Sequence, residues 1–148
     1  MKKAKKILIM GLPGAGKTYL ANVLHKILGG EWINADKVRG DANDWDFSLN
    51  GRKRQAERMK KLADEAIEKN NYVIVDFVCP TPQTRQNFNA DFVIWMDTIK
   101  EGRFADTNKM FVAPKKFDLR VTKKNAEVIA LEIIDKINKK FKDKKSKI

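Results

Sequence analysis

The sequence predicts an α/β protein with a three-layer α/β/α fold around a five-stranded parallel sheet. Segments typical of strands and of helices alternate along the chain, the order that builds a parallel sheet covered on both faces. The strand segments are continuous apolar runs, as expected where both faces of a strand are buried. The length of 148 residues fits one domain, residues 1–148, with a basic tail at about 139–148.

Five apolar runs are the expected strands. They cover residues 7–10, 31–34, 72–78, 92–96 and 117–121. The third run is the richest in β-forming side chains, so we expect it to form the central strand. Right-handed crossovers would bring the loops that follow these strands together at one edge of the sheet.

Three longer helices are expected between and after the strands. The first covers residues 16–28, the second is capped by Ser48 and runs to about Asn70, and the last begins at Lys123. Apolar residues at helical spacing predict the face that each helix buries. These faces are expected to contain Leu20, Leu24, Ile27 and Leu28 in the first helix, Ala56, Met59, Ala63, Ala66 and Ile67 in the second, and Val128, Leu131, Ile134, Ile137 or Asn138, and Phe141 in the last.

Composition excludes some classes of protein. The single cysteine, Cys79, rules out an internal disulfide framework and a cysteine-rich metal site. No stretch approaches the roughly 18–20 apolar residues of a membrane span, so we expect a soluble, cytoplasmic protein. The net charge of +12 suits anionic ligands or nucleic acid. However, many lysines lie at residues 2–6 and 139–147, where a solvated tail is favoured over a nucleic-acid surface.

Residues 11–18 carry the clearest chemical motif. The octet fits the pattern G-x-x-x-x-G-K-[ST] and stands between a buried strand and a helix. Its backbone N–H groups and the helix N-terminus are suited to hold the phosphates of ATP. Lys17 is expected to reach the β- and γ-phosphates, and Thr18 to ligate Mg²⁺. The expected nucleotide contacts are Gly11, Leu12, Pro13, Gly14, Ala15, Gly16, Lys17, Thr18 and Tyr19.

Two carboxylates follow strands at the same edge of the sheet as the phosphate-binding loop (P-loop) of residues 11–18. Asp36 comes just after the second strand, where it could take the proton of an acceptor hydroxyl or hold Mg²⁺; the alternative is an N-cap for the turn 37–40. Asp76 ends a buried strand, the usual place for a metal-linked carboxylate in P-loop proteins. We therefore expect Lys17, Asp36 and Asp76 to be catalytic, with Thr18 and Asp36 as metal ligands.

Further segments resemble the adenylylsulfate kinase family. They read Asn-Ala-Asp-Lys-Val-Arg at 34–39, Phe-Ser-Leu-Asn-Gly-Arg at 47–52, Asp-Phe-Val-Cys-Pro at 76–80, and the run at 104–114. That family transfers the γ-phosphoryl group of ATP to the 3′-hydroxyl of adenosine 5′-phosphosulfate, giving PAPS. The resemblance covers about residues 5–135 and implies a P-loop kinase with this small-molecule acceptor, a role in sulfate assimilation, and a homodimer as a candidate assembly.

This chain departs from the family pattern at several positions. Asn34 and Ala35 replace the first two residues of the family's Asp-Gly-Asp segment. The basic lid segment is shorter, with only Lys100 and Arg103 left. Since the family often has a neutral residue where Asp76 stands, we suggest as a hypothesis that Asp76 partly replaces the carboxylate that is missing at position 34.

The resemblance also implies a set of acceptor contacts. Its two phenylalanines, here Phe47 and Phe104, would sandwich the adenine of the acceptor; the alternative is that they belong to the core. The planar arginine side chains suit bidentate contacts with phosphate or sulfate, and the alternative is surface ion pairs. The full implied set is Asp36, Arg39, Phe47, Arg52, Gln55, Val78, Cys79, Arg85 and Phe104.

Two other functions remain open from the sequence. One keeps the kinase chemistry with a nucleoside or polynucleotide end as acceptor; the other is a nucleotide-binding protein without catalysis. Among the remaining residues with distinctive side chains, His25 is given no role, and Cys79 is expected to be structural, the alternative being a reactive thiol. The tryptophans Trp32, Trp45 and Trp95 are expected to be packing residues.

Overall fold

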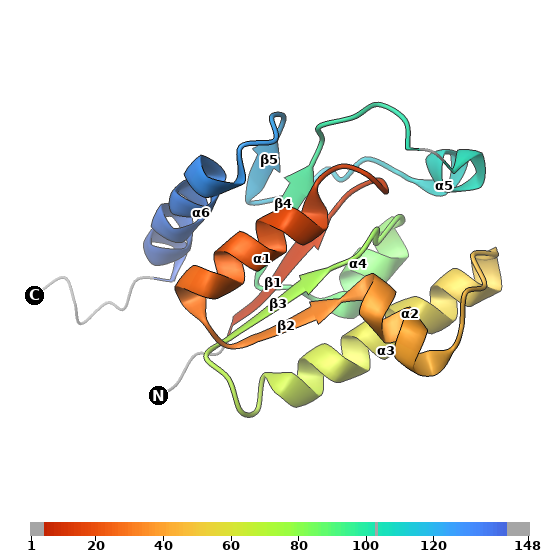
Figure 1. Cartoon of the computed structure of the whole chain (residues 1–148), viewed down its shortest axis with the longest axis horizontal. Helices are drawn as coiled ribbons and strands as arrows, with labels where there is room; N and C mark the ends of the chain where they lie inside the picture. Colours follow the sequence, from red (N-terminus) through yellow and green to blue (C-terminus); the bar gives the residue numbers. More distant parts are fainter. Residues whose placement is uncertain (1–4, 103, 142–148) are drawn as a thin grey trace, which may run out of the picture.

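The computed structural model describes residues 5–102 and 104–141, and it has the predicted α/β architecture (Figure 1). Five strands form one parallel sheet in the order β2-β3-β1-β4-β5. The strands are β1 (Lys5–Met10), β2 (Glu31–Asn34), β3 (Tyr72–Asp76), β4 (Phe92–Met96) and β5 (Leu119–Val121). The helices are α1 (Lys17–Leu28), α2 (Ala35–Ala42), α3 (Leu49–Ala66), α4 (Pro82–Phe88), α5 (Ala105–Met110) and α6 (Ala126–Lys140).

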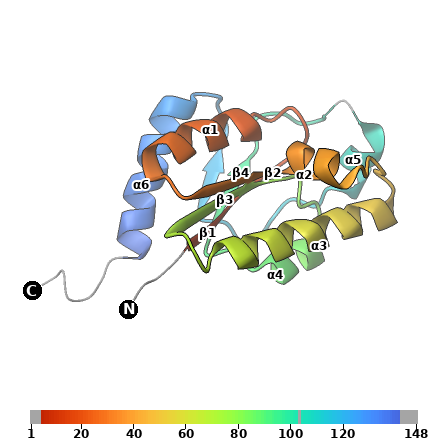
Figure 2. The same ribbon diagram turned by 60° about the horizontal axis from the view of Figure 1, so that its bottom comes forward.

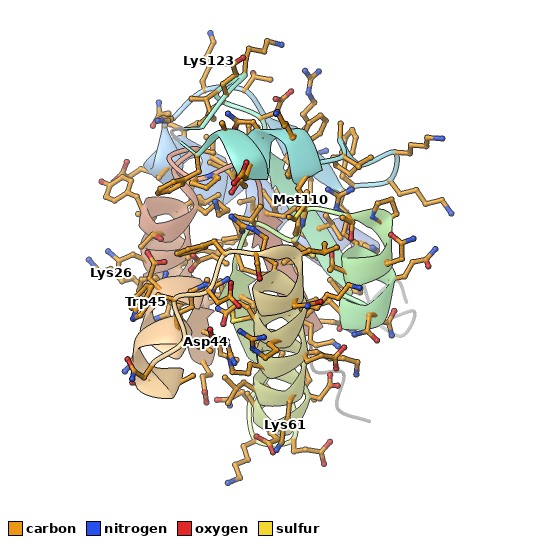
Figure 3. All side chains as sticks on the ribbon, turned by 90° about the vertical axis from the view of Figure 1, so that its right-hand side faces the viewer. Lys26, Asp44, Trp45, Lys61, Met110 and Lys123 are labelled. Atoms are coloured by element: carbon orange, nitrogen blue, oxygen red, sulfur yellow. The ribbon has the colours of Figure 1, made fainter. Side chains whose placement is uncertain are left out.

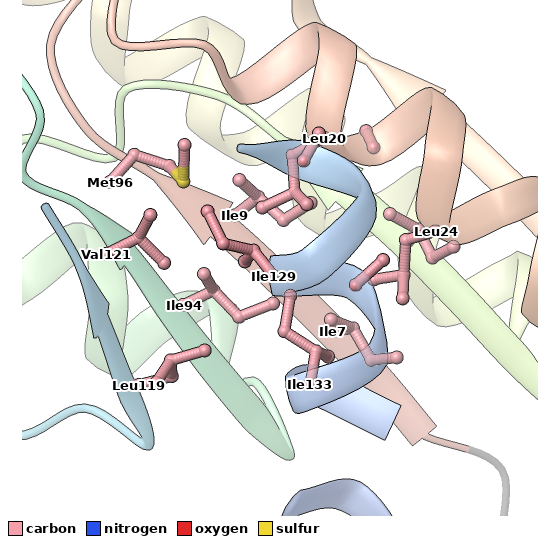
Figure 4. Close-up of a cluster of buried hydrophobic side chains, with 14 of the residues drawn as sticks. Ile7, Ile9, Leu20, Leu24, Ile94, Met96, Leu119, Val121, Ile129 and Ile133 are labelled. Atoms are coloured by element: carbon pink, nitrogen blue, oxygen red, sulfur yellow. The ribbon is translucent and has the colours of Figure 1, made fainter. Parts of the chain in front are cut away.

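Helices cover both faces of the sheet, as Figure 2 shows with α1 on one side and α3 and α4 on the other. On β1, Ile7 and Ile9 join the core beneath α1 and α6, which Figure 4 shows in close-up. Leu8 and Met10 join the second core, beneath α3 and α4. Burial on both faces explains why this strand is a continuous apolar run.

The prediction of the central strand is wrong. The centre of the sheet is β1, which pairs with β3 on one side and β4 on the other. Both β1 and β3 are buried, so an apolar composition indicates that a strand is buried but not which of the two lies at the centre of the sheet. The order comes from the first crossover, which places β2 beyond the position later filled by β3.

The buried face of the last helix agrees with the prediction only in part: Ile137 is buried, and Ile134 and Phe141 pack against the core, as predicted. Val128 and Leu131 are 59% and 65% exposed. The predicted residues from Val128 to Ile137 follow one another in steps of three, and each such step shifts by about 60° around a helix of 3.6 residues per turn, so the set runs from the exposed side to the buried side. The stripe that contains two alanines packs on α1, because small side chains let the helices approach. The buried residues are Ala126, Ile129, Ala130, Ile133 and Ile137. On α1, the predicted Ile27 is likewise half exposed.

The second predicted helix begins as expected, since the Ser48 hydroxyl accepts a hydrogen bond from the Gly51 N–H at 3.2 Å. The short helices α2, α4 and α5 were not predicted. Each has eight residues or fewer, too few for a clear apolar period. At α2 the cap is Asn34, whose side chain accepts from the Lys37 N–H, so the alternative role of Asp36 as the cap is wrong.

Part of the basic tail lies outside the described residues. Lys139 and Lys140 end α6, while residues 1–4, 103 and 142–148 are not described, including Arg103 of the short lid. Within the described ranges, no helix combines the length and the apolar character that a membrane crossing needs.

Candidate functional site

The P-loop (residues 11–18) connects β1 to α1 at the carboxyl edge of the sheet. Gly11 and Gly16 have positive φ angles of 150° and 101°, where a β-carbon would be strained. A β-carbon on Gly11 would also stand 2.6 Å from the Met96 carbonyl oxygen. The glycines therefore let the loop curl closely against the end of β4.

Lys17 is buried within this loop. Its ammonium donates to the carbonyl oxygens of Gly11 at 2.8 Å and Leu12 at 2.9 Å. Burial lowers the pKa of Lys17 to about 8, although the negative charges of Asp76 and Asp36 oppose the shift. The ammonium thus rests on loop carbonyls, beside the space that a phosphate chain would enter.

The other P-loop side chain with a predicted role, Thr18, belongs to a polar cluster with residues of β2 and β3. Its hydroxyl donates to Asp76 Oδ1 at 3.3 Å, and Asn34 Nδ2 donates to the same oxygen at 3.0 Å. Asn34 and Asp76 are direct partners in the register of β2 and β3. Asp76 is only 2% exposed, and burial raises the pKa of its carboxyl group while the hydrogen bonds oppose that shift.

Trp32 belongs to the same cluster, a position that was not predicted from the sequence. Its indole Nε1 donates to Asp76 Oδ2 at 2.6 Å. Trp32 is thus a polar neighbour of a candidate catalytic group as well as a packing residue. A signal was present in the sequence: alternation along β2 puts Trp32 on the same face of the sheet as Asn34.

One cavity of about 570 Å³ connects the P-loop to the ends of β2 and β3. The predicted site residues that line it are Pro13, Gly14, Gly16, Lys17, Thr18, Tyr19, Asp36, Arg39, Phe47, Arg52, Gln55, Asp76, Val78, Cys79 and Phe104. It is also lined by Asn34, Ala35, Trp45, Ala56, Phe77 and Pro80, which were not predicted as site residues. Gly11, Leu12, Ala15 and Arg85 were predicted but are not in its lining.

Two arginines and three aromatic residues form one part of this cavity, which we call the aromatic end (Arg39, Trp45, Phe47, Arg52 and Phe104). Phe47 and Phe104 are 44% and 48% exposed, so the alternative that they belong to the core is wrong. Their rings are nearly parallel, with an interplanar angle of 11° and centroids 6.1 Å apart. They present flat apolar surface to the cavity.

Arg39 is 4% exposed and anchors the loop that follows α2. Its guanidinium donates to the carbonyl oxygens of Asp44 at 3.0 Å and Asp46 at 3.1 Å, and its central carbon lies 4.3 Å from the Phe47 ring centroid. Burial lowers the pKa of Arg39, with smaller opposing effects from nearby aspartates. This arginine therefore contacts the face of the Phe47 ring and holds the loop that carries it.

Arg52 faces the same ring from α3. Its central carbon lies 5.3 Å from the Phe47 centroid, and one terminal nitrogen donates to the Thr107 hydroxyl. Its Nε is a buried donor with no hydrogen-bond partner among the described residues. A buried, unpaired donor of a cation is costly, so the Arg52 side chain, which lines the cavity, is suited to an anionic ligand.

Arg85 and Gln55 have supporting positions. Arg85 donates to the carbonyl oxygens of Cys79, at 3.0 Å, and Val112, and so joins the loop after β3 to the segment after α5. Gln55 donates to the Ala35 carbonyl at 3.0 Å, which ties α3 to the start of α2. Within residues 5–102 and 104–141, neither Arg85 nor the two arginines of the aromatic end forms an ion pair, which contradicts the surface ion-pair alternative.

The remaining tryptophans differ from one another. Trp45 is half exposed at the aromatic end, so the prediction of a packing residue is wrong there; Figure 3 labels it beside Asp44. Trp95 packs against Phe117, with ring centroids 5.6 Å apart, as predicted.

Cys79, another predicted site residue, is fully buried, and burial raises the pKa of its thiol to about 12. That thiol is unreactive at neutral pH, in keeping with the predicted structural role.

A comparison with protein families matches residues 7–93, more than half of the chain, to the family described as AAA domain. The chain belongs to this family. Among curated proteins, this AAA-domain chain is 30% identical over 114 residues to shikimate kinase from Legionella pneumophila (strain Corby), a match that covers 72% of the chain and 65% of that protein. The chain thus spans less than two thirds of that relative's length.

Solved structures show the same fold. APS kinase from Mycobacterium tuberculosis, in complex with AMPPNP and APS, has a TM-score of 0.75 at 21% identity, covering 93% of this chain and 99% of that one. The hexameric APS kinase from Thiobacillus denitrificans has a TM-score of 0.76 at 21% identity, with coverage of 94% and 29%. Shikimate kinase from Acinetobacter baumannii, with shikimate, has a TM-score of 0.64 at 17% identity, with coverage of 96% and 97%. The AAA-domain chain therefore has the P-loop kinase fold.

Proposed function

We propose that this protein is an ATP-dependent phosphotransferase that moves the γ-phosphoryl group of ATP to the 3′-hydroxyl of adenosine 5′-phosphosulfate, giving PAPS. The observation that carries the proposal is that Arg52, whose buried Nε has no partner among the described residues, lines the same cavity as Lys17 of the P-loop. Phosphate-binding and anion-binding groups within one cavity suit the transfer of a phosphoryl group between two bound anionic molecules.

The nucleotide end of the proposed site is the P-loop. Its backbone N–H groups and the N-terminus of α1 would hold the β- and γ-phosphates, and the ammonium of Lys17 would leave the loop carbonyls to contact them. Thr18, Asp36 and Asp76 offer the hard oxygen donors that Mg²⁺ prefers, so these residues fit the ion. Bound there, Mg²⁺ would neutralise charge on the transferring phosphoryl group.

The aromatic end of the cavity would hold the adenine of the acceptor. A flat ring between two others needs about 7 Å, twice the ordinary carbon–carbon contact distance. The centroids of Phe47 and Phe104 are 6.1 Å apart, and the ring planes are at most that far apart, so the two rings would separate by at least about 1 Å as the base enters. Stacking on aromatic faces contributes about 1–3 kcal/mol per base, and Arg52 would pair with the anionic groups of the same molecule.

Asp36 is the proposed base for the acceptor hydroxyl. It lies in the first turn of α2, exposed to the cavity between the P-loop and the aromatic end. From there its carboxylate would orient the hydroxyl and accept its proton as the phosphoryl group transfers. Gln55 fixes the start of α2 through the Ala35 carbonyl, so it supports the position of Asp36.

Shikimate is the second candidate acceptor, favoured by the names of the curated relatives. A carboxylate could also pair with Arg52. However, the stacked pair of Phe47 and Phe104 offers two parallel faces suited to a planar base. This pair leads us to prefer the nucleotide acceptor.

The test is phosphoryl transfer from labelled ATP, with adenosine 5′-phosphosulfate, shikimate, a nucleoside and a 5′-hydroxyl oligonucleotide offered in parallel. We expect label in the first acceptor, and none in a Lys17→Ala control. Label mainly in another acceptor would replace the proposed substrate. Label in none, with ATP still bound, would favour a nucleotide-binding protein without catalysis. The homodimer stays a prediction, measurable by light scattering.

A further inference from the structure

Each oxygen of the Asp76 carboxylate has one partner of its own, and both share the amide of Asn34. Oδ1 accepts from the Thr18 hydroxyl at 3.3 Å and from Asn34 Nδ2 at 3.0 Å. Oδ2 accepts from the indole Nε1 of Trp32 at 2.6 Å and, over a longer 3.3 Å, from the same Asn34 Nδ2. The Trp32 bond therefore fixes which oxygen faces the P-loop threonine.

We propose that Trp32 is a positioning residue, which holds Asp76 so that its Oδ1 is presented to Thr18 and to the divalent cation of a bound nucleotide. The inference rests on the proposed nucleotide site, and it adds a residue that neither the motif nor the family resemblance indicates. It does not depend on the identity of the acceptor.

The chemistry of the indole suits this role. Its N–H only donates, so the bond to Oδ2 has one direction and does not invert. It is also neutral, so it satisfies one oxygen of the buried carboxylate without cancelling the negative charge. A lysine or arginine at the same place would compete with the cation for that charge. Lys17, the nearby cation, instead donates to the carbonyl oxygens of Gly11 and Leu12.

Trp32 is itself fixed from two sides. In the sheet it is the register partner of Ile74, two residues before Asp76. Its ring lies 6.1 Å from that of His25 on α1 and packs against the core beneath that helix. An indole held by both the sheet and α1 can hold the carboxylate in one orientation.

Asn34 matches this arrangement. Its Nδ2 donates to Asp76, while its Oδ1 accepts from the Lys37 N–H at 3.0 Å and so caps α2, the helix that carries Asp36. An aspartate at position 34 would set two carboxylates side by side in the register. The amide at 34 and the carboxylate at 76 therefore complement each other, with one negative charge between them.

The first test compares Trp32→Phe with Trp95→Phe, a half-buried tryptophan on β4 that does not line the cavity. ADP affinity is measured by calorimetry, in EDTA and across a Mg²⁺ titration. We expect Trp32→Phe to leave the ADP affinity in EDTA unchanged. The gain in ADP affinity that Mg²⁺ gives should be about tenfold smaller, in the range known for residues that support metal ligands. Trp95→Phe should behave as the wild type.

A double-mutant cycle separates positioning from a structural role. If Trp32 acts through Asp76, Trp32→Phe will add nothing to the Mg²⁺ defect of Asp76→Asn. Equal losses of ADP affinity with and without Mg²⁺, an unchanged Mg²⁺ dependence, or additive defects would overturn the inference. Normal Mg²⁺-linked ADP binding without transfer to any acceptor would refute the proposed function and leave the role of Trp32 intact.

If Trp32→Phe does not fold, the wild-type indole is the probe. In the Trp45→Phe/Trp95→Phe protein, Trp32 is the only tryptophan, since the chain has three. Adding Mg²⁺ to the ADP complex should shift its emission, because the charge that faces Oδ1 changes. Emission that stays the same across the Mg²⁺ titration would contradict the inference.

Discussion

At the scale of single residues, the site is defined by buried charged side chains and their partners. Lys17 rests on carbonyl oxygens of its own loop, Asp76 receives three different donors, and Arg52 keeps one donor unpaired among the described residues. Burial makes each of these groups sensitive to what binds. Anionic ligands are therefore expected to bind at Lys17 and Arg52, and a cation at Asp76.

Lys17 predicts a pH dependence of ATP binding. Burial lowers its pKa to about 8 in the free protein, so the ammonium loses its proton as pH rises through 8. A triphosphate favours the charged form and raises this pKa in the complex, so binding above pH 8 takes up a proton. ATP affinity should fall by up to tenfold per pH unit above about 8. Calorimetry at pH 7 and pH 9, in buffers of different ionisation enthalpy, measures both effects.

A matched control for this prediction is Lys17→Met, which removes the titrating group. Its weaker affinity for ATP should change little between pH 7 and pH 9. The account of Lys17 fails if the wild type binds ATP equally well at both values and takes up no proton.

Cys79 predicts protection from alkylation. Its thiol is fully buried, and burial raises its pKa to about 12, so almost no reactive thiolate forms at pH 8. Iodoacetamide should leave the native protein unlabelled and label one site after denaturation, as measured by intact mass. Rapid labelling of the native protein would show that the loop after β3 opens.

At the scale of elements, the loop from α2 to α3 positions the aromatic end. Asp44 pairs with Arg54 at 3.0 Å and with Arg58 at 2.8 Å, which joins the loop to α3. Arg39 holds the same loop from α2 through two of its carbonyl oxygens. The loop is thus fixed at both ends, and Phe47 lies within it.

Gly51 predicts a stability effect in this element. A β-carbon there would lie 2.0 Å from the Asp46 carbonyl oxygen, which forces the backbone of the loop to move. Gly51→Ala should lower the free energy of unfolding by about 1–3 kcal/mol, and it should weaken acceptor binding because Phe47 shifts. Urea denaturation measures the first effect.

Gly40→Ala is the matched control, since a β-carbon there meets only the Trp45 ring at 3.8 Å, an ordinary contact. This change should be neutral or stabilising by up to about 1 kcal/mol, because alanine favours a helix. Equal effects of the two substitutions would rule out the close approach at Gly51.

At the scale of the whole molecule, sequence patterns predicted what depends on local chemistry. The strands 31–34 and 92–96 were predicted at their observed bounds, and the P-loop lies where its motif indicated. The order of strands was not predictable from composition, because β1 and β3 are both buried. The buried face of α6 was predicted only in part, since residues chosen at steps of three drift around the helix and leave the apolar stripe.

The candidate site divides in the same way. Sequence motifs predicted that Asp36, Arg39 and Arg52 share one cavity, because the segments that carry them follow β2 at the edge of the sheet where the P-loop also lies. Arg85 is not in the lining, because its guanidinium reaches backbone carbonyls that depend on the path of the chain after α5. The bond from Trp32 to Asp76 joins residues 44 positions apart: alternation along β2 indicates the face on which Trp32 lies, but the partner becomes visible once β2 pairs with β3.

The central claim is that one cavity holds ATP beside an anionic, aromatic acceptor. The most direct measurement titrates adenosine 5′-phosphosulfate into protein saturated with Mg²⁺ and a non-hydrolysable ATP analogue. We predict saturable binding that Arg52→Gln weakens about tenfold, the size of one lost charge-assisted hydrogen bond. Arg120→Gln, which removes an arginine paired with Asp97 near the opposite edge of the sheet, should bind as the wild type does. Equal affinity in the Arg52 variant, or no binding to the wild type, would contradict the account.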